Sequence, residues 1–480
     1  MIKQFALGSA IIVLLTAASV ATAALLELDS DLDPFREGSL EISKDVLPDV
    51  APGKPRTILV LGSDRRYGDR RAGIPPRSDS MLVVRLDPAR KATAMMSIPR
   101  DLKVPIPGHG TKRINTAYGD GGPQLSLKTV KALGIQVNHI VNVNFGGFQR
   151  AVNRLGCVYA DVDRRYFNDN RPPVASTENY ATIDLKAGYQ RLCGEDSLDY
   201  VRFRHLDDDF VRAARQQDFV RQLKAQVGIG QLWGDRRELL KIFGRYTQTD
   251  IARGSNARVL GFIKLVVEAA KSPITEVRFP AGETLSDGSQ RVSSADLRRT
   301  IRRFEGVRGK RRDGDSASRK RPKRIKRRKG GLAPGLVAAE REGEDHVLNI
   351  ATKLRGMDVY FPKARVSRGR YGRDSPRAYT IRDRGGTPHR AYRIVLSQGD
   401  NGQFYGVQGV AWSQPPILKN PTDRVRMRRR TYQRYFDGKR IRLIAWKGPK
   451  AWYWISNTLS QQLSNAQMMD IARSLQRIGE

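Results

Sequence analysis

Cysteine and histidine are scarce in this sequence, which has 2 cysteines and 5 histidines among 480 residues. No histidine pair accompanies Cys157 and Cys193, which argues against a metal site built on the two thiols. Two states remain for the pair. They are a disulfide, which would stabilise the fold by roughly 3–4 kcal/mol, and two buried free thiols. There is no Ser–His–Asp arrangement, and we expect His205 to support the fold rather than to catalyse.

Acidic residues are also few, since 86 Lys+Arg stand against 49 Asp+Glu and give a formal net charge of +37. A charge of this sign implies a polyanionic neighbour, such as nucleic acid, anionic lipid, a teichoic-acid-like polymer or a pyrophosphate substrate. No recognisable nucleic-acid-reading motif is present. The chain is too long for one ordinary domain, and its 39% of hydrophobic residues is enough to build cores.

The N-terminus predicts the location of the protein. Residues 5–26 carry no charged side chain, and a helix needs about 20 apolar residues to cross a bilayer. Lys3 precedes this run and acidic residues follow it, so the positive-inside tendency predicts a single-pass cell-membrane protein whose bulk is extracytoplasmic. A cleaved signal peptide is the alternative, because Ala21 and Ala23 fit an A-x-A site. Either reading excludes an intracellular nucleic-acid-binding regulator.

Composition divides the chain further. We predict an anchor at 1–26, a spacer at 27–55, a catalytic domain at 56–305, a basic disordered linker at 306–335 and a small β-rich domain with a closing helix at 336–480. Short β-branched runs at 57–63, 80–86 and 92–98 predict strands, and residues 210–227 predict a helix. This order indicates an α/β domain with a central mixed sheet. The linker is either a solvated spacer or an adhesive for anionic wall polymer or lipid.

An up-down-up arrangement of the three strands would gather polar residues at one end of the sheet. Asp64 and Asp79 flank the connection between the first two strands, Arg77 precedes the second, and Arg100 follows the third. Carboxylates suit a divalent hard cation, and guanidiniums suit the phosphate that such a cation bridges.

A second charged group lies at 202–217. Alternation of Val201 and Phe203 with arginines predicts a strand that carries Arg202 and Arg204 on one face. A helix follows, on which Asp209, Arg212 and Gln216 share a side. The alternative for this helix is a surface stripe of salt bridges.

These blocks resemble the LytR–CpsA–Psr family in order and spacing over about residues 56–305. The matching blocks are LGSDRR (61–66), RSDSMLVVRLDP (77–88), SIPRDLKVPIPGHG (97–110), RINTAYGDGGP (113–123), VNFGGF (143–148), DYVRFRH (199–205) and DDDFVRAARQQ (207–217). Ser80 departs from the Thr usual in the family, and Cys157 and Cys193 replace residues that are often Gly and Asn.

The resemblance implies an outward-facing, membrane-anchored phosphotransferase. Such an enzyme transfers a glycopolymer with one phosphate from a polyprenyl-pyrophosphate carrier to a peptidoglycan sugar hydroxyl. By motif position, Asp64 and Asp79 would bind Mg²⁺, with Mn²⁺ as the alternative ion. A set of polar side chains would hold the pyrophosphate: Arg77, Arg100, Lys128, Arg202, Arg204, Arg212 and Gln216. Asp209 would orient an arginine or accept the proton of the acceptor hydroxyl, and the general base stays open.

Two alternatives remain. A pyrophosphohydrolase would use the same residues with water as acceptor. A non-catalytic wall-binding scaffold would act through the linker and the C-terminal domain, and it has no need for a metal–phosphate group of residues.

Overall fold

The fold is taken from a computed structural model. It describes residues 39–42, 46–47, 50–51, 53–64, 77–170, 181–203, 209–227, 231, 235–251, 259, 261–262, 265, 274–280, 282–307, 323–324, 331–354, 356–399, 402–427 and 430–479. The predicted anchor at 5–26 lies outside these residues. No helix within them is long and apolar enough to cross a membrane.

The chain forms two compact units that are interleaved in sequence. The first unit contains residues 1–157, 193–202 and 227–311, and the second contains 158–192, 203–226 and 312–480. The boundaries expected from composition are sequential, whereas two segments from the middle of the chain group with the C-terminal region. Each unit is described by itself.

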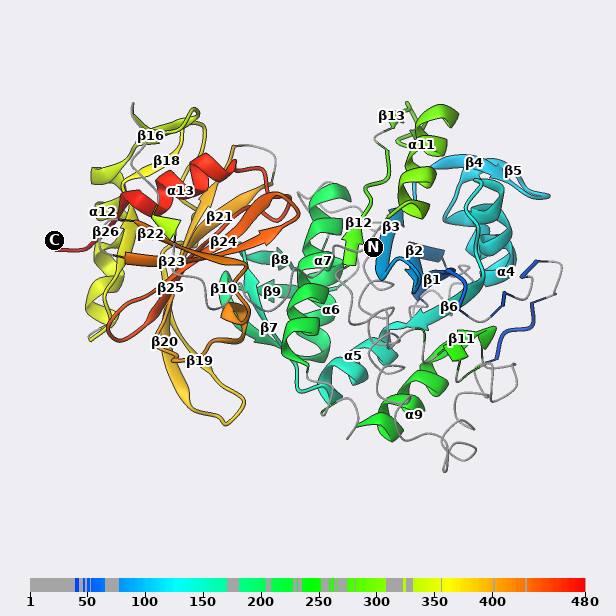
Figure 1. The fold of residues 1–480 in the computed structure, drawn as a ribbon, viewed down its shortest axis with the longest axis horizontal. Helices are drawn as coiled ribbons and strands as arrows, with labels where there is room; N and C mark the ends of the chain where they lie inside the picture. Colours follow the sequence, from blue (N-terminus) through cyan, green and yellow to red (C-terminus); the bar gives the residue numbers. More distant parts are fainter. Residues whose placement is uncertain are drawn as a thin grey trace. The chain divides into compact units, whose positions relative to one another are not determined.

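A six-stranded mixed sheet is the centre of the first unit, with the order β11-β6-β1-β2-β3-β12 (Figure 1). Its strands are β1 (Arg56–Asp64), β2 (Arg77–Asp87), β3 (Ala92–Ile98), β6 (His139–Asn144), β11 (Thr247–Thr249) and β12 (Ile274–Glu276). β2 pairs antiparallel with β1 and β3, and β6 pairs parallel with β1. The predicted mixed α/β fold and the three-strand meander are therefore confirmed.

Helices cover both faces of this sheet. They are α4 (Thr116–Ala132), α5 (Phe145–Arg154), α9 (Arg236–Tyr246) and α11 (Ser294–Glu305), and α6 (Gly194–Arg202) packs against α5. Leu59 and Leu61 of β1 pack in one core with Val130 of α4 and Phe304 of α11. The alternate residues of β1 face the other side, where α5 contacts β1 and β6.

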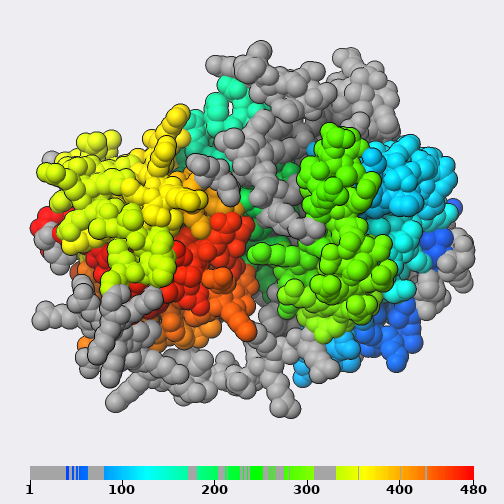
Figure 2. Space-filling model, turned by 90° about the horizontal axis from the view of Figure 1, so that it is seen from above, coloured from blue at the N-terminus to red at the C-terminus, as the bar shows by residue number. Residues whose placement is uncertain are grey.

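Short antiparallel ribbons complete the first unit. They are β4 (Lys103–Ile106) with β5 (Gly110–Arg113), and β13 (Glu283–Thr284) with β14 (Gln290–Arg291). Figure 2 shows residues 282–305 in green at the surface beside the cyan β4–β5 region. Lys103 Nζ lies 2.9 Å from Asp287 Oδ2 across this contact.

The strand predicted around Arg202 is wrong, because Val201 and Arg202 end helix α6. Leu198 and Val201 are buried three residues apart, as expected on a helix. A four-residue alternation does not distinguish a strand from the end of a helix, and Arg202 lies in the last turn of α6.

An antiparallel-rich eight-stranded sheet is the centre of the second unit, with the order β15-β22-β23-β24-β25-β21-β20-β19. Its strands are β15 (Lys323–Arg324), β19 (Arg377–Arg382), β20 (Pro388–Ser397), β21 (Phe404–Val410), β22 (Asp423–Met427), β23 (Arg430–Asp437), β24 (Arg440–Lys447) and β25 (Trp452–Ser456). The predicted β-rich C-terminal region is confirmed.

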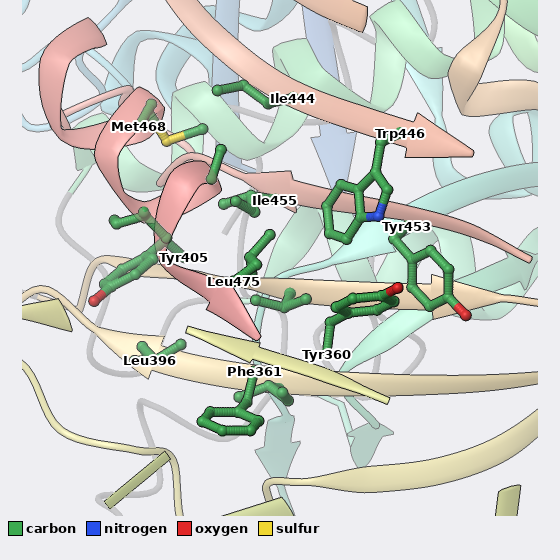
Figure 3. Packing of buried hydrophobic residues seen from close by; sticks show 14 of the residues in the cluster. Tyr360, Phe361, Leu396, Tyr405, Ile444, Trp446, Tyr453, Ile455, Met468 and Leu475 are labelled. Carbon is green, nitrogen blue, oxygen red and sulfur yellow. The ribbon is translucent and has the colours of Figure 1, made fainter. Parts of the chain in front are cut away.

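One face of this sheet packs against helices α12 (Glu340–Ala351) and α13 (Asn465–Ser474) and against two short ribbons. The ribbons are β16 (Leu336–Ala338) with β18 (Ala364–Val366), and β17 (Tyr360–Pro362) with β26 (Leu475–Arg477). Figure 3 shows this core, in which Trp446 of β24 stacks on Tyr453 of β25 with 5.3 Å between ring centroids.

The opposite face packs against segments from the middle of the chain. They form the ribbon of β7 (Val158–Val162) with β10 (Gly188–Leu192). The same unit contains the pair β8 (Tyr166–Asn168) with β9 (Ile183–Leu185), and helix α7 (Asp209–Gln226), which contacts β7. Tyr159 and Tyr189 share a core with Leu443, Ala445 and Trp454, which alternate with the residues of the first face.

Three local predictions for the C-terminal region need correction. The closing helix expected at 465–478 ends at Ser474, and Leu475–Arg477 form strand β26. Helix α12 was not predicted. Lys323 and Arg324, expected to be disordered, pair with β22. Backbone pairing of two residues needs no apolar periodicity, so the sequence carries no signal for it.

Candidate functional site

Polar residues from β1 and β2 meet at one edge of the first sheet. Asp64 and Arg77 are directly opposite each other in the β1–β2 ladder, which places their Cα atoms about 4.5–5.5 Å apart. Ser63 pairs with Ser78 and Gly62 with Ser80, so Asp79 is the extra residue of a β-bulge. Bulges occur often beside active sites because they re-aim side chains.

Arg100 comes to the same edge from β3. The last β2–β3 pair is Met81 with Ile98, and Arg100 leaves the strand two residues later, alongside the start of β2. Its Nε donates to Asp101 Oδ2 at 3.0 Å, and Arg113 Nη1 lies 3.6 Å from Asp101 Oδ1. The backbone therefore brings Asp64, Asp79 and Arg100 to one end of the sheet, together with Arg77.

Arg202 is held by a carboxylate that the sequence analysis did not single out. Its Nε donates to Asp199 Oδ1 at 2.8 Å, its Nη2 bonds the same oxygen, and its guanidinium lies 5.9 Å from the ring centroid of Phe145. Asp199 is 6% exposed. Burial raises the pKa of Asp199, and the charge of Arg202 opposes that rise. The i, i+3 spacing on α6 was the available signal.

In the second unit, helix α7 carries Asp209, Arg212 and Gln216. Arg212 is 4% and Gln216 2% exposed, so they do not form the exposed salt-bridge stripe that was the alternative for this helix. Their neighbour Arg215 is fully buried, donates from Nη2 to the Phe203 carbonyl at 2.6 Å, and lies 4.6 Å from the Tyr166 ring centroid. Arg215 thus ties α7 to the residue that precedes Arg204.

Other predicted site residues are less informative. Lys128 is exposed on α4. Arg204 and His205 lie outside the described residues, as do the side chains of Asp64, Arg77, Asp79 and Asp209, whose backbones are described.

Backbone position brings Asp64 and Asp79 to the same end of the sheet, and a pair of carboxylates is a ligand type that suits a hard divalent cation. Mg²⁺ commonly binds one or two carboxylates and completes its shell with waters and phosphate oxygens, and Asp64 and Asp79 supply two carboxylates on neighbouring strands. Within the described part of the chain, no group of three or more His, Cys, Asp or Glu residues could hold a metal. This absence does not concern a site with only two carboxylates, such as Asp64 and Asp79.

Cys157 and Cys193 form a disulfide. The bond joins the residue where the chain leaves the first unit, before β7, to the residue where it returns, after β10. The disulfide therefore links the two ends of the intervening segment, residues 158–192, covalently.

The LytR_cpsA_psr family model matches residues 25–302, more than half of the chain. The chain belongs to this family. Among LytR_cpsA_psr relatives, the regulatory protein MsrR of Staphylococcus aureus (strain COL) is 37% identical over 173 residues, which cover 36% of this chain and 49% of MsrR. The polyisoprenyl-teichoic acid–peptidoglycan teichoic acid transferase TagT of Bacillus subtilis (strain 168) is 36% identical over 169 residues, covering 35% of this chain and 51% of TagT.

The chain thus spans about half the length of the curated relatives it matches. Among solved LytR_cpsA_psr structures, B. subtilis TagV is 24% identical, covers 53% of this chain and 97% of TagV, and has a TM-score of 0.42. The structure of TagT bound to LIIa-WTA is 24% identical, covers 56% of this chain and 99% of that chain, and has a TM-score of 0.41.

Proposed function

We propose that this protein transfers a glycopolymer, together with one phosphate, from a polyprenyl-pyrophosphate carrier to a sugar hydroxyl of peptidoglycan. Membership of the LytR_cpsA_psr family supports the proposal, as does the similarity to TagT, a transferase of teichoic acid to peptidoglycan. The observation that carries it is the sheet edge where Asp64 faces Arg77 and the bulge holds Asp79.

The proposed chemistry needs charge neutralisation more than a covalent nucleophile. The acceptor oxygen attacks the phosphorus that bears the glycan, the bond from that phosphorus to the bridging oxygen breaks, and polyprenyl phosphate leaves. Negative charge develops on the oxygens of the transferred phosphate and of the leaving group. Asp209 orients an arginine or receives the proton of the acceptor hydroxyl.

Each arginine has a role in this proposal. Arg77 and Arg100 hold the phosphate at the sheet edge, and Arg202 is pre-oriented by its two hydrogen bonds to Asp199. A guanidinium fixed in this way loses little side-chain entropy when it binds phosphate. Arg204, Arg212, Gln216 and the more distant candidate Lys128 complete the set.

Asp64 and Asp79 would hold the Mg²⁺ or Mn²⁺. When bound, the ion would neutralise phosphate charge and orient the pyrophosphate. The chain's own contribution is to fix the two carboxylates at the edge of the sheet, on adjacent hydrogen-bonded strands.

We also propose that residues 5–26 anchor the protein in the cell membrane, with the catalytic residues outside. The basic linker would then lie near anionic wall polymer or lipid headgroups, to which it would adhere electrostatically.

The test uses the purified full chain, a polyprenyl-pyrophosphate-linked glycan and a peptidoglycan oligomer, with and without Mg²⁺. A phosphodiester-linked product detected by mass spectrometry is expected, and Asp79→Ala and Arg202→Ala are expected to abolish it. Arg434→Ala is the matched control, because it removes an arginine–carboxylate pair with Asp423 in the second unit. Free phosphorylated glycan without adduct would identify a pyrophosphohydrolase. Wall binding without turnover would identify a scaffold.

A further inference from the structure

We propose that the C-terminal region, residues 336–480, positions helix α7 for catalysis. This inference rests on the proposed function, because α7 carries Arg212 and Gln216 of the proposed pyrophosphate site. One face of the region's sheet packs against the ribbon of β7 and β10, and α7 contacts β7 and residues Pro416–Leu418. Helix α7 and the ribbon lie in the segment matched by the family model. The C-terminal region thus has a physical connection to residues of the proposed chemistry within one compact unit.

Four charged residues form the main attachment, and we name them the α7 clamp: Asp218, Arg221, Asp437 and Arg442. Arg221 Nη1 donates to Asp218 Oδ1 at 2.8 Å, and Arg221 Nη2 donates to Asp437 Oδ2 at 2.6 Å. Arg442 Nη1 lies 3.8 Å from Asp218 Oδ1. Two residues come from α7 and two from β23 and β24, so the clamp crosses between the helix and the sheet.

The clamp is partly withdrawn from water and is supported from a third element. Asp218 is 8% exposed. Burial lowers the pKa of Arg442, and the charge of Asp218 opposes that shift. Gln461 Nε2 also donates to Asp437 Oδ2 at 2.7 Å. The clamp carboxylates therefore have fixed partners, and α7 is held at a defined rotation about its axis.

Rotation matters because the clamp and the proposed ligand residues lie on different sides of α7. At about 100° per residue, Gln216 lies roughly 40° from Arg212, whereas Asp218 and Arg221 lie roughly 240° and 180° from it. Turning the helix about its axis would move Arg212 and Gln216 sideways, in the direction opposite to the clamp residues, and sliding it would shift all four residues together along the axis. Displacement of a substrate-positioning group by about 1 Å costs on the order of 100-fold in rate.

A second attachment fixes the other end of α7. The Gln226 amide bonds the backbone of Tyr159 in both directions, receiving from its N–H at 2.9 Å and donating to its carbonyl at 2.8 Å. Asp161, two residues further along β7, accepts from Arg393 Nη1 at 3.1 Å and from Trp454 Nε1 at 3.1 Å. The helix, the ribbon and the C-terminal sheet are thus joined by buried polar contacts.

The test compares the full chain with Arg221→Ala, Asp437→Ala and the double variant R221A/D437A. Arg434→Ala is the matched control, since its pair with Asp423 lies in the same sheet and connects β22 with β23. Two quantities are measured well below the unfolding midpoint. They are the Kd for inorganic pyrophosphate in the presence of Mg²⁺, and the amide hydrogen exchange of residues 209–217.

Both single clamp variants are expected to raise the Kd by roughly 1.5- to fivefold and to speed exchange in 209–217. The side chains of Arg221 and Asp437 are 35% and 41% exposed, and a pair of that exposure contributes about 0.2–1 kcal/mol. The double variant is expected to change both quantities no more than the larger of the two single changes, because both substitutions remove the same ion pair. A general loss of stability would instead add the two single changes. Unchanged exchange and Kd in the single variants, or equal changes in Arg434→Ala, would overturn the positioning role. If the wild-type chain binds no pyrophosphate, the proposed function has failed. The exchange of 209–217 then decides alone whether the clamp orders α7.

Discussion

Neutralising Asp161 is expected to leave a buried guanidinium without its counter-charge. Arg393 is fully buried and Asp161 is 7% exposed. Only Nη1 of Arg393 bonds the carboxylate, at 3.1 Å, and its Nε and Nη2 have no hydrogen-bond partner in the part of the chain that the structure describes. Removing one member of such a pair costs roughly 3–5 kcal/mol. In a folded unit of about 150–250 residues, each kcal/mol of lost stability lowers the Tm by about 2–4 °C. Asp161→Asn is therefore expected to lower the Tm of the second unit by about 6–20 °C.

The same geometry predicts that the pair adds little net stability. Arg393→Met alone would leave Asp161 buried with Trp454 as its remaining donor, at a similar cost of roughly 3–5 kcal/mol. The double variant D161N/R393M buries no charge and keeps an acceptor for the indole N–H. It is therefore expected to be more stable than either single variant.

Chemical and thermal unfolding of the full chain would measure these differences, with Arg434→Met as the control. Arg434 pairs with Asp423, which is 41% exposed, so its loss is expected to cost only about 0.2–1 kcal/mol. The reasoning would be refuted if Asp161→Asn cost no more than the control, or if the double variant lost the sum of the two single losses.

Three further outcomes are expected. Replacing Cys157 and Cys193 with serine removes a disulfide whose cysteines are 36 residues apart in sequence. The free energy of unfolding, measured by urea titration, should fall by about 4 kcal/mol. Gly406→Ala would place its Cβ 2.0 Å from the Ile394 carbonyl oxygen and should cost about 1–3 kcal/mol; an unchanged Tm would contradict the close approach. Burial raises the pKa of Asp199 above 3.8, so the folded state binds its proton more readily, and stability relative to Asp199→Asn should fall as pH rises from about 3.8 through the raised value. A flat difference between the two pH profiles would rule this out.

Local patterns predicted the elements of the first sheet well. The runs that form β1, β2 and β3 are rich in β-branched and apolar residues and are buried on both faces, so each reads as a strand without further information. Their up-down-up order was also predicted, and it agrees with the antiparallel pairing of β2 with β1 and β3. The bulge at Asp79 did not follow, because register is a property of two strands and not of one.

Contacts between residues far apart in the chain could not be predicted from local sequence patterns. Tyr159 and Tyr189 alternate like residues of any core strand, and nothing local indicates that their partners lie more than 200 residues away. The sequence likewise gives no local signal that Asp161 is buried against Arg393, which is 232 residues away. The ion pair of Asp199 with Arg202, by contrast, could have been predicted, because a separation of three residues is the ordinary spacing of an ion pair on a helix.

The interleaved chain has a consequence for the order of synthesis. The ribbon that contains β7 is made long before the sheet that it covers, and β25 is the last strand of that sheet to appear. About 300 residues separate the two, so translation at 5–20 residues per second takes roughly 15–60 s to supply the missing partner. During that interval the apolar side of the ribbon stays exposed, because the sheet that covers it has not been synthesised. We therefore expect chaperones to bind the nascent chain at this stage.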